Sequence, residues 1–84
     1  MNFVIHFNLE DGYEDEALLL ARRLFATFDT EIDSLALIPV ADEEIDLVYD
    51  DRLIASLRRD GRPPRVADVV ALLAEGSGKA RTAE

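Results

Sequence analysis

The stretch Phe3-Val-Ile-His-Phe-Asn8 decides how the rest of the chain folds. The two phenylalanines and Ile5 alternate with the other side chains, so they share one face of a predicted strand. The loop Leu9-Glu-Asp-Gly12 follows, and the apolar spacing of residues 13–28 predicts an amphipathic helix. In small α/β folds such a strand-loop-helix unit usually carries the chemistry. This loop holds no thiol, no nucleophile-base pair and no phosphate-binding glycine pattern, so the sequence specifies a fold better than a function.

The composition limits the classes of partner. The 84 residues predict a single domain over residues 1–75, and 18 acidic against 9 basic residues give a net charge of −9. This charge repels phosphate backbones and anionic lipid, so we expect neither nucleic acid nor a membrane as a partner. The N-terminus lacks the pattern of a signal peptide, and we expect a cytoplasmic protein.

The chain contains no cysteine. This excludes disulfides, thiolate catalysis and thiolate metal sites within the sequence. We expect no cofactor.

The remaining elements follow in a regular order. Residues 35–40 predict a buried parallel strand whose pairing ends at Pro39. Residues 45–49 and 52–57 predict a β-hairpin with a tight turn at Asp50-Asp51, where a glycine would be easier to accommodate. A last helix is expected over residues 65–75, and the small, polar residues 76–84 predict a disordered tail.

Carboxylates gather around the start of the first helix. Asp11 and Glu14 have the spacing of a capping box, with Asp in place of the usual Ser or Thr. The alternative is a hard divalent cation, although the spacing lacks the pattern of a calcium loop. Its candidate ligands are Glu10, Asp11, Glu14 and Asp15.

Two further features allow more than one interpretation. His6 is expected on the sheet face opposite the phenylalanines, as an ordinary surface histidine or, alternatively, as a ligand or base. Arginines cluster before the last helix, in a solvated loop or in a site for an anion or an acidic partner. They are Arg58, Arg59, Arg62 and Arg65.

Three segments together resemble the selenoprotein W/T/H family, also called the Rdx family. They are the strand-loop-helix entry at residues 5–13, the hairpin at residues 45–54 and Arg58-Arg-Asp-Gly-Arg-Pro-Pro64 before the last helix. The resemblance covers roughly residues 3–75. It implies a small thioredoxin-like α/β fold of order β-α-β-β-β-α, with a four-stranded mixed sheet in the order 2-1-3-4 and two helices on one face.

In that family the loop after the first strand carries a pair of cysteines or a cysteine and a selenocysteine. Aligned on Gly12-Tyr13, those two positions are Asn8 and Asp11 in this sequence, and neither can exchange electrons. The resemblance therefore implies a non-catalytic, cysteine-less relative that acts as a protein-interaction or assembly domain. Its expected interaction residues around the loop and its neighbours are Gly12, Tyr13, Pro39, Arg58, Arg62 and Pro64.

With both helices on one face, the opposite face of the sheet would lack cover. We expect Val4, Val48, Ile38 and Ile54 on that face, and an apolar sheet face in water usually finds a partner. The partner would be another protein or a second copy of the chain, docked on this face or on the edge strand 52–57.

Other function classes stay open at the level of the sequence. One is an enzyme that uses the carboxylates with His6 or Tyr13. Another is an acidic metal-binding module at residues 10–16, and a third is a redox role that uses the thiols of a partner. The sequence does not decide whether the chain is an enzyme, and the missing thiols favour a protein without catalytic activity.

Overall fold

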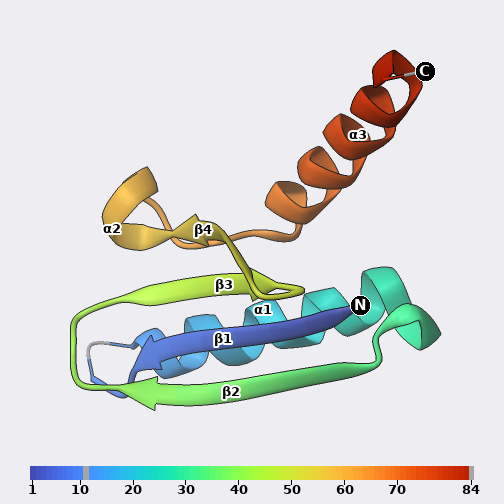
Figure 1. Ribbon diagram of the computed structural model, residues 1–84. Coiled ribbons are helices and arrows are strands. Elements are labelled where there is room, and N and C mark those ends of the chain that lie inside the picture. The colour runs from blue at the N-terminus through green and yellow to red at the C-terminus, as the bar shows by residue number, and fades with distance from the viewer. Residues whose placement is uncertain (11, 84) are drawn as a thin grey trace.

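The computed structural model describes residues 1–10 and 12–83, with side chains as far as residue 75. Its main strands and helices follow the predicted order, with the short helices η1 and α2 in addition (Figure 1). They are β1 (Asn2–Asn8), α1 (Tyr13–Phe28), the 3-10 helix η1 (Asp29–Glu31), β2 (Ser34–Val40), β3 (Ile45–Tyr49), β4 (Arg52–Ser56), α2 (Leu57–Asp60) and α3 (Val66–Ala83).

The sheet has the strand order β2-β1-β3-β4. β1 pairs parallel with β2 and antiparallel with β3, and β3 pairs antiparallel with β4. The sheet is therefore mixed, and the parallel pair is joined through α1 because a parallel connection needs a crossover. The predicted four-stranded order is confirmed.

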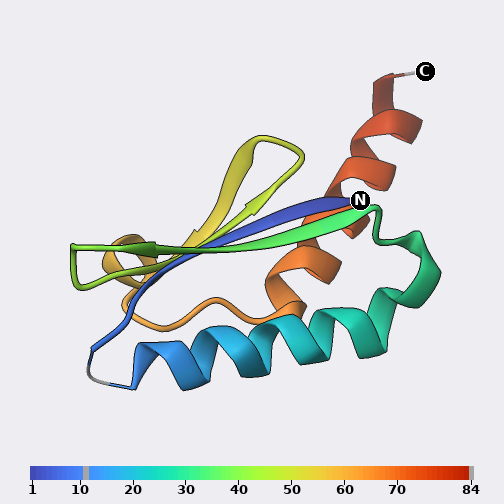
Figure 2. The ribbon, with the colours of Figure 1, turned by 90° about the horizontal axis from the view of Figure 1, so that it is seen from below.

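One side of the sheet is covered by helices. Figure 2 shows α1 lying along this side, and α3 begins there beside it. α1 contacts β1, and α3 contacts both β4 and α1. The other face of the sheet carries no helix among the described residues.

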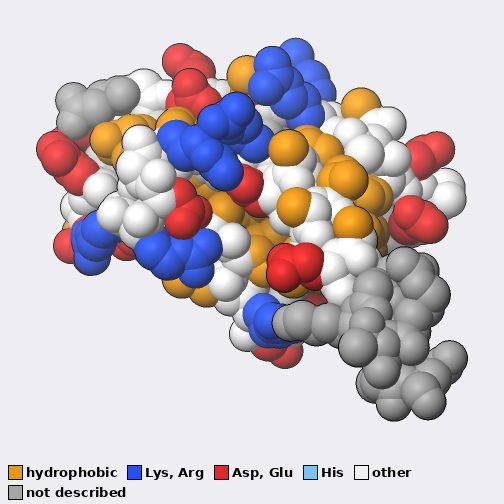
Figure 3. Space-filling view, turned by 90° about the horizontal axis from the view of Figure 1, so that it is seen from above, with side chains coloured by type: hydrophobic (Ala, Val, Ile, Leu, Met, Phe, Trp, Pro, Cys, Tyr) orange, Lys and Arg blue, Asp and Glu red, His pale blue; other side chains and the backbone are white. Residues whose placement is uncertain are grey.

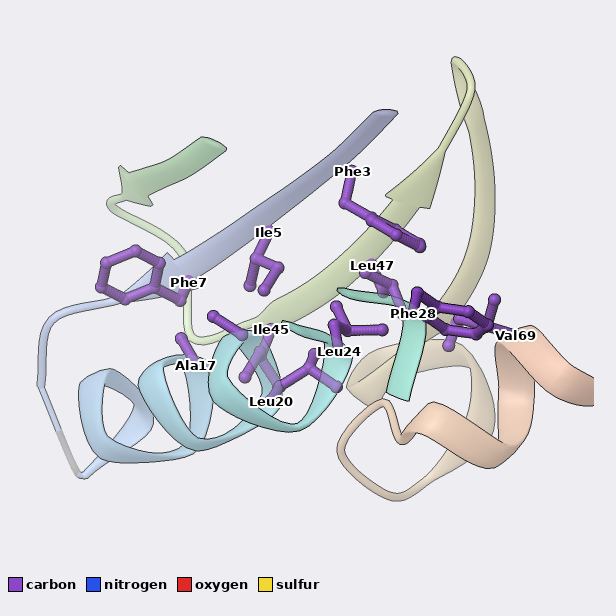
Figure 4. Packing of buried hydrophobic residues seen from close by; sticks show 12 residues of the cluster. Phe3, Ile5, Phe7, Ala17, Leu20, Leu24, Phe28, Ile45, Leu47 and Val69 are labelled. Atoms are coloured by element: carbon purple, nitrogen blue, oxygen red, sulfur yellow. The ribbon is translucent and has the colours of Figure 1, made fainter. Parts of the chain in front are cut away.

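The core lies between the sheet and α1. Phe3 and Ile5 of β1 are almost completely buried, as are Ile45 and Leu47 of β3, so the predicted apolar face of the first strand is confirmed. Figure 4 shows these side chains pointing toward α1. The ring of Phe3 lies 6.1 Å from that of Phe28 and 5.3 Å from that of Tyr49. The helices supply Ala17, Leu20, Ala21, Leu24, Phe28 and Val69.

β2 is an exposed edge strand, so its predicted burial was wrong. Leu37 and Ile38 are 37% and 42% exposed, because β2 is the outermost strand and no described strand pairs with its outer edge. Pro39 does not end the pairing either, since the register continues from Pro39 opposite Phe7 to the end of the strand. An edge strand tolerates proline because the N–H groups on its outer side have no neighbouring strand to donate to.

The hairpin between β3 and β4 is confirmed, and its turn uses left-handed backbone angles. Asp50 and Asp51 have φ values of 47° and 68°, which is the region that favours glycine. A hydrogen bond offsets the cost of this backbone conformation at Asp50, because its Oδ1 accepts a bond of 3.0 Å from the backbone N–H of Asn2. The turn is thereby joined to the start of β1.

A β-bulge changes which face Ile54 occupies. Leu47 pairs with Ala55, whereas Val48 pairs with Leu53, so Ile54 has no partner on β3. An unpaired bulge residue breaks the alternation of the strand. Ile54 packs against the core, and its predicted place on the open face was wrong. Leu53 takes that place and is 49% exposed.

The segment after β4 forms a short helix that the sequence analysis missed. The Oγ of Ser56 caps α2 by accepting a hydrogen bond of 3.4 Å from the N–H of Arg59, and Gly61 with φ 74° ends it. Ser before the helix and Gly after it are the usual signals. α3 continues to Ala83, beyond the predicted end at Glu75. Only the backbone is described for residues 76–83, and the disorder predicted for residues 76–84 stays a prediction.

Candidate functional site

Asn8 lies at the end of β1. It occupies one of the two positions where the selenoprotein W/T/H family, which the sequence resembles, has a redox residue. Its side chain is buried and donates hydrogen bonds from Nδ2 to the carbonyl oxygens of Val40, at 3.3 Å, and Ala41, at 2.9 Å. Its Oδ1 accepts a hydrogen bond of 2.8 Å from the N–H of Glu10. The amide thus joins the loop after β1 to the loop after β2, and Asn8 serves as a structural link.

The start of α1 differs from the predicted capping box. The N-cap is Gly12, with φ 79° and no side-chain cap, so the helix begins one position later than Asp11 would place it. The loop is closed by a hydrogen bond of 3.2 Å from the N–H of Tyr13 to the carbonyl oxygen of Glu10. Asp11 itself lies outside the described residues.

The acidic side chains at this end of the molecule do not form a metal site in the part that is described. Glu10, Glu14 and Asp15 are exposed, and no three potential ligands converge among the described side chains. Glu14 and Asp15 lie in the first turn of α1, where carboxylates interact favourably with the helix dipole.

A groove runs beside α1, between that helix and the loop that leads into α3. At one end a hollow of about 450 Å³ is lined by Gly12, Tyr13, Asp15, Glu16, Leu19 and Pro63. At the other end a hollow of about 280 Å³ is lined by Glu16, Leu19, Leu20, Arg23, Arg62, Pro63, Pro64 and Arg65. The two hollows share Glu16, Leu19 and Pro63, and we call them together the α1 groove.

The α1 groove brings together only part of the predicted interaction residues. Gly12, Tyr13, Arg62 and Pro64 line it. Pro39 lies instead on the exposed edge strand β2, and Arg58 lies on α2 beside Glu44, with 3.6 Å between its Nη2 and the Oε2 of Glu44. The sequence analysis placed Asp15 and Glu16 only in the alternative metal-binding module, and Arg65 only in the alternative site for an anion or an acidic partner. It assigned the remaining lining residues to no site. The outward apolar position of Leu19 was the available signal.

Asp68 holds the wall of the groove in place. Its carboxylate accepts hydrogen bonds from Nη1 and Nη2 of Arg62, at 3.0 and 2.6 Å, and one of 2.8 Å from the backbone N–H of Arg65. The last bond caps α3, because a carboxylate in the first turn satisfies a free N–H there. The bond with Arg62 holds the pKa of Asp68 below its usual value, so the carboxylate is charged at neutral pH.

The opposite face of the sheet is only partly open. Val4 and Val48, which pair across β1 and β3, are half-buried, while Ile38 and Leu53 on the flanking strands are exposed. His6 lies on the same face, opposite Asp46 of β3. The predicted uncovered face therefore exists, with Leu53 in place of Ile54.

A close pair of carboxyl groups, Glu44 and Asp46, lies at the start of β3. The Oγ of Ser56 donates a hydrogen bond of 3.1 Å to Oε1 of Glu44, and Oδ1 of Asp46 is buried without a hydrogen-bond partner among the described residues. Burial raises the pKa of Asp46, and the neighbouring Glu44 carboxyl raises it further, while the Ser56 hydroxyl and His6 oppose the rise. The charged form of Asp46 is therefore unfavourable in the folded protein.

We expect Asp46→Asn to raise the free energy of unfolding at about pH 7 by about 1 kcal/mol, because it removes the charge from a half-buried carboxyl group whose Oδ1 has no hydrogen-bond partner among the described residues. The raised pKa makes the folded wild type bind the proton more tightly than the unfolded chain does, so the wild type loses stability as the pH rises through the folded-state pKa. The variant lacks this loss. Urea denaturation at about pH 4 and about pH 7 should show a gain at the higher pH only.

The control for this prediction is Asp42→Asn, which removes an exposed carboxylate from the connection that leads into β3. We expect a change below about 0.5 kcal/mol at either pH. Equal gains for Asp42→Asn and Asp46→Asn would show that general charge relief, not the burial of Asp46, is responsible.

Comparison with known proteins links the chain to others through its fold. No known protein family matches the sequence, and no curated protein matches it. The structure is similar to that of a selenoprotein W-related protein from Vibrio cholerae, with a TM-score of 0.73 at 19% identity over 81% of this chain and 85% of the other. It is also similar to a protein from Bordetella parapertussis, with a TM-score of 0.76 at 17% identity over 89% of this chain and 95% of the other.

At these identities the likeness shows the fold, and the predicted thioredoxin-like fold is confirmed. Within the described residues no helix has the length and apolar character needed to span a bilayer.

Proposed function

We propose that this chain is a non-catalytic, cysteine-less relative of the selenoprotein W-like redox proteins and that it serves as a protein-interaction or assembly domain. Its binding surface is the α1 groove, which begins at the loop after β1. Fold likeness to a selenoprotein W-related protein supports the relationship. The groove is the observation that carries the proposed function, because it gives this loop a concave surface without redox residues.

The environment of Asn8 supports the loss of catalysis. A redox residue must be able to reach a substrate, whereas the side chain of Asn8 is 5% exposed and uses both its oxygen and its nitrogen on the backbone. No cysteine elsewhere in the chain can take over electron transfer. The amide of Asn8 instead links the backbone of Glu10 to the carbonyl oxygens of Val40 and Ala41.

The shape of the groove supports a protein partner. Leu19 is 39% exposed at the point where the two hollows meet, and Pro63 lines both. An apolar centre with polar groups around it is the usual arrangement of a binding site. Two hollows in a row suit an extended segment better than a single small molecule.

The test is co-purification from the native cell with the wild-type chain and two matched variants as bait. Leu19→Ser alters the groove, and Val48→Ser alters the half-buried valine of the open sheet face. We expect a partner that is lost with Leu19→Ser and kept with Val48→Ser. A partner lost only with Val48→Ser would place the interaction on the sheet, and a partner kept by both variants would contradict the groove as the binding surface.

A further inference from the structure

The end of the α1 groove near α3 is basic, although the whole chain has a net charge of −9. Arg23, Arg62 and Arg65 line this hollow, and Glu16 is its one acidic residue. Figure 3 shows several basic side chains on one face, with hydrophobic and acidic side chains between and beside them. Because salt screens charges beyond about 10 Å, a ligand in the hollow responds mainly to these nearby residues.

The three arginines differ in how far their charge is already neutralised. Arg62 is bonded to Asp68 through two nitrogens and is held in place. Arg23 and Arg65 are exposed, and neither guanidinium has a hydrogen bond or an ion pair among the described residues. The backbone of Arg65 is fixed because its N–H bonds to Asp68. Two uncompensated guanidinium groups thus stand at the rim on firmly placed backbone.

The floor between these groups is apolar. Leu20 and Pro64 are buried beneath the hollow, and Leu19 and Pro63 form its partly exposed sides. A volume of about 280 Å³ holds one or two side chains of ordinary size. A ligand that uses the whole site needs an apolar group for the floor and negative charge for the rim.

We propose that this basic end of the α1 groove binds an acidic peptide segment of a partner, with an apolar side chain on the Leu20–Pro64 floor and flanking carboxylates on Arg23 and Arg65. The inference rests on the proposed function and specifies the chemistry of the partner. A guanidinium matches a carboxylate because its planar N–H groups can donate two parallel hydrogen bonds. Charge complementarity therefore selects an acidic segment.

The probe is a fluorescein-labelled peptide with blocked ends and the sequence Asp-Glu-Leu-Phe-Glu-Asp, measured by fluorescence anisotropy with the full chain. We expect saturable binding that weakens as salt is added. Arg23→Ala and Arg65→Ala should each weaken it about fivefold to tenfold, because each removes one charge-assisted contact. Arg22→Ala is the matched control, since Arg22 is an exposed neighbour on α1 that does not line the groove, and it should bind like the wild type.

Two control peptides separate the parts of the proposal. A peptide with Asn and Gln in place of the acids should lose binding, and so should one with Ala in place of Leu-Phe. Equal binding of the amide peptide, or unchanged binding by both Arg23→Ala and Arg65→Ala, would overturn the inference. Equal competition by succinate would overturn it too, because the hollow would then be a simple anion site. Circular dichroism checks that each variant is folded.

The outcome also separates this inference from the proposed function. A co-purified partner that needs Leu19 but is indifferent to Arg23 and Arg65 would overturn the acidic peptide and leave the proposed function in place. A partner lost with Arg23→Ala and Arg65→Ala, but kept with Arg22→Ala, would support both.

Discussion

Asn8→Asp is expected to lower the free energy of unfolding by about 3 kcal/mol at about pH 7, because it buries a carboxylate against two carbonyl oxygens. The amide now donates to Val40 and Ala41, and an ionised carboxylate can donate to neither. Burial and these carbonyl groups would raise the pKa of the new Asp, so the loss should be smaller at about pH 4 than at about pH 7. Urea denaturation at both pH values measures it.

Two further variants separate the charge from the lost hydrogen bonds. Asn8→Ala should cost about 2 kcal/mol at either pH, because it leaves buried polar groups unpaired without adding charge. Asn2→Ala should cost below about 1 kcal/mol, since Asn2 is exposed at the other end of β1. If Asn8→Asp proved as stable as the wild type, Asn8 would not be the structural link described here.

Leu24→Ala is expected to lower the free energy of unfolding by about 3 kcal/mol, within the range of about 2–5 kcal/mol for buried leucines. Leu24 is fully buried in the part of α1 that packs under the sheet. A domain of this size has a total stability of only about 4–13 kcal/mol, so one such cavity is a large fraction of it. Thermal and urea denaturation should both show the loss.

Leu18→Ala is the matched control for this core substitution. Leu18 lies on the same helix and is 47% exposed, so the change in helix propensity is the same while the cavity is absent. We expect a cost below about 1 kcal/mol. Similar losses for Leu18→Ala and Leu24→Ala would mean that α1 packs on the sheet through a different face.

The candidate site was only partly predictable from the sequence. The resemblance singled out the loop after β1 and the segment before the last helix, and the structure brings Gly12, Tyr13, Arg62 and Pro64 into one groove. Pro39 and Arg58, which the resemblance also singled out, do not line this groove. Arg23 and Arg65 were missed as a pair, because they are far apart in the sequence and only the packing of α1 beside the loop makes them neighbours.

The sequence by itself determined the order of the main elements and the main core face. Alternation in β1 predicted the burial of Phe3 and Ile5, and the two aspartates marked the hairpin turn. The lack of cysteine excluded thiol chemistry. These properties depend on local backbone preferences and on the kinds of side chain present, and both can be read along the chain.

The tertiary structure alone decided the properties that depend on neighbours distant in sequence. β2 is exposed because its apolar run lies at the edge of the sheet, and Ile54 packs on the core because a bulge shifts the register of β4. Asn8 is a structural link because the loop after β2 places two carbonyl oxygens beside it. The α1 groove exists only where α1 and the loop before α3 meet. Pairing and packing between distant segments set each of these outcomes, and hydrophobic periodicity carries no information about them.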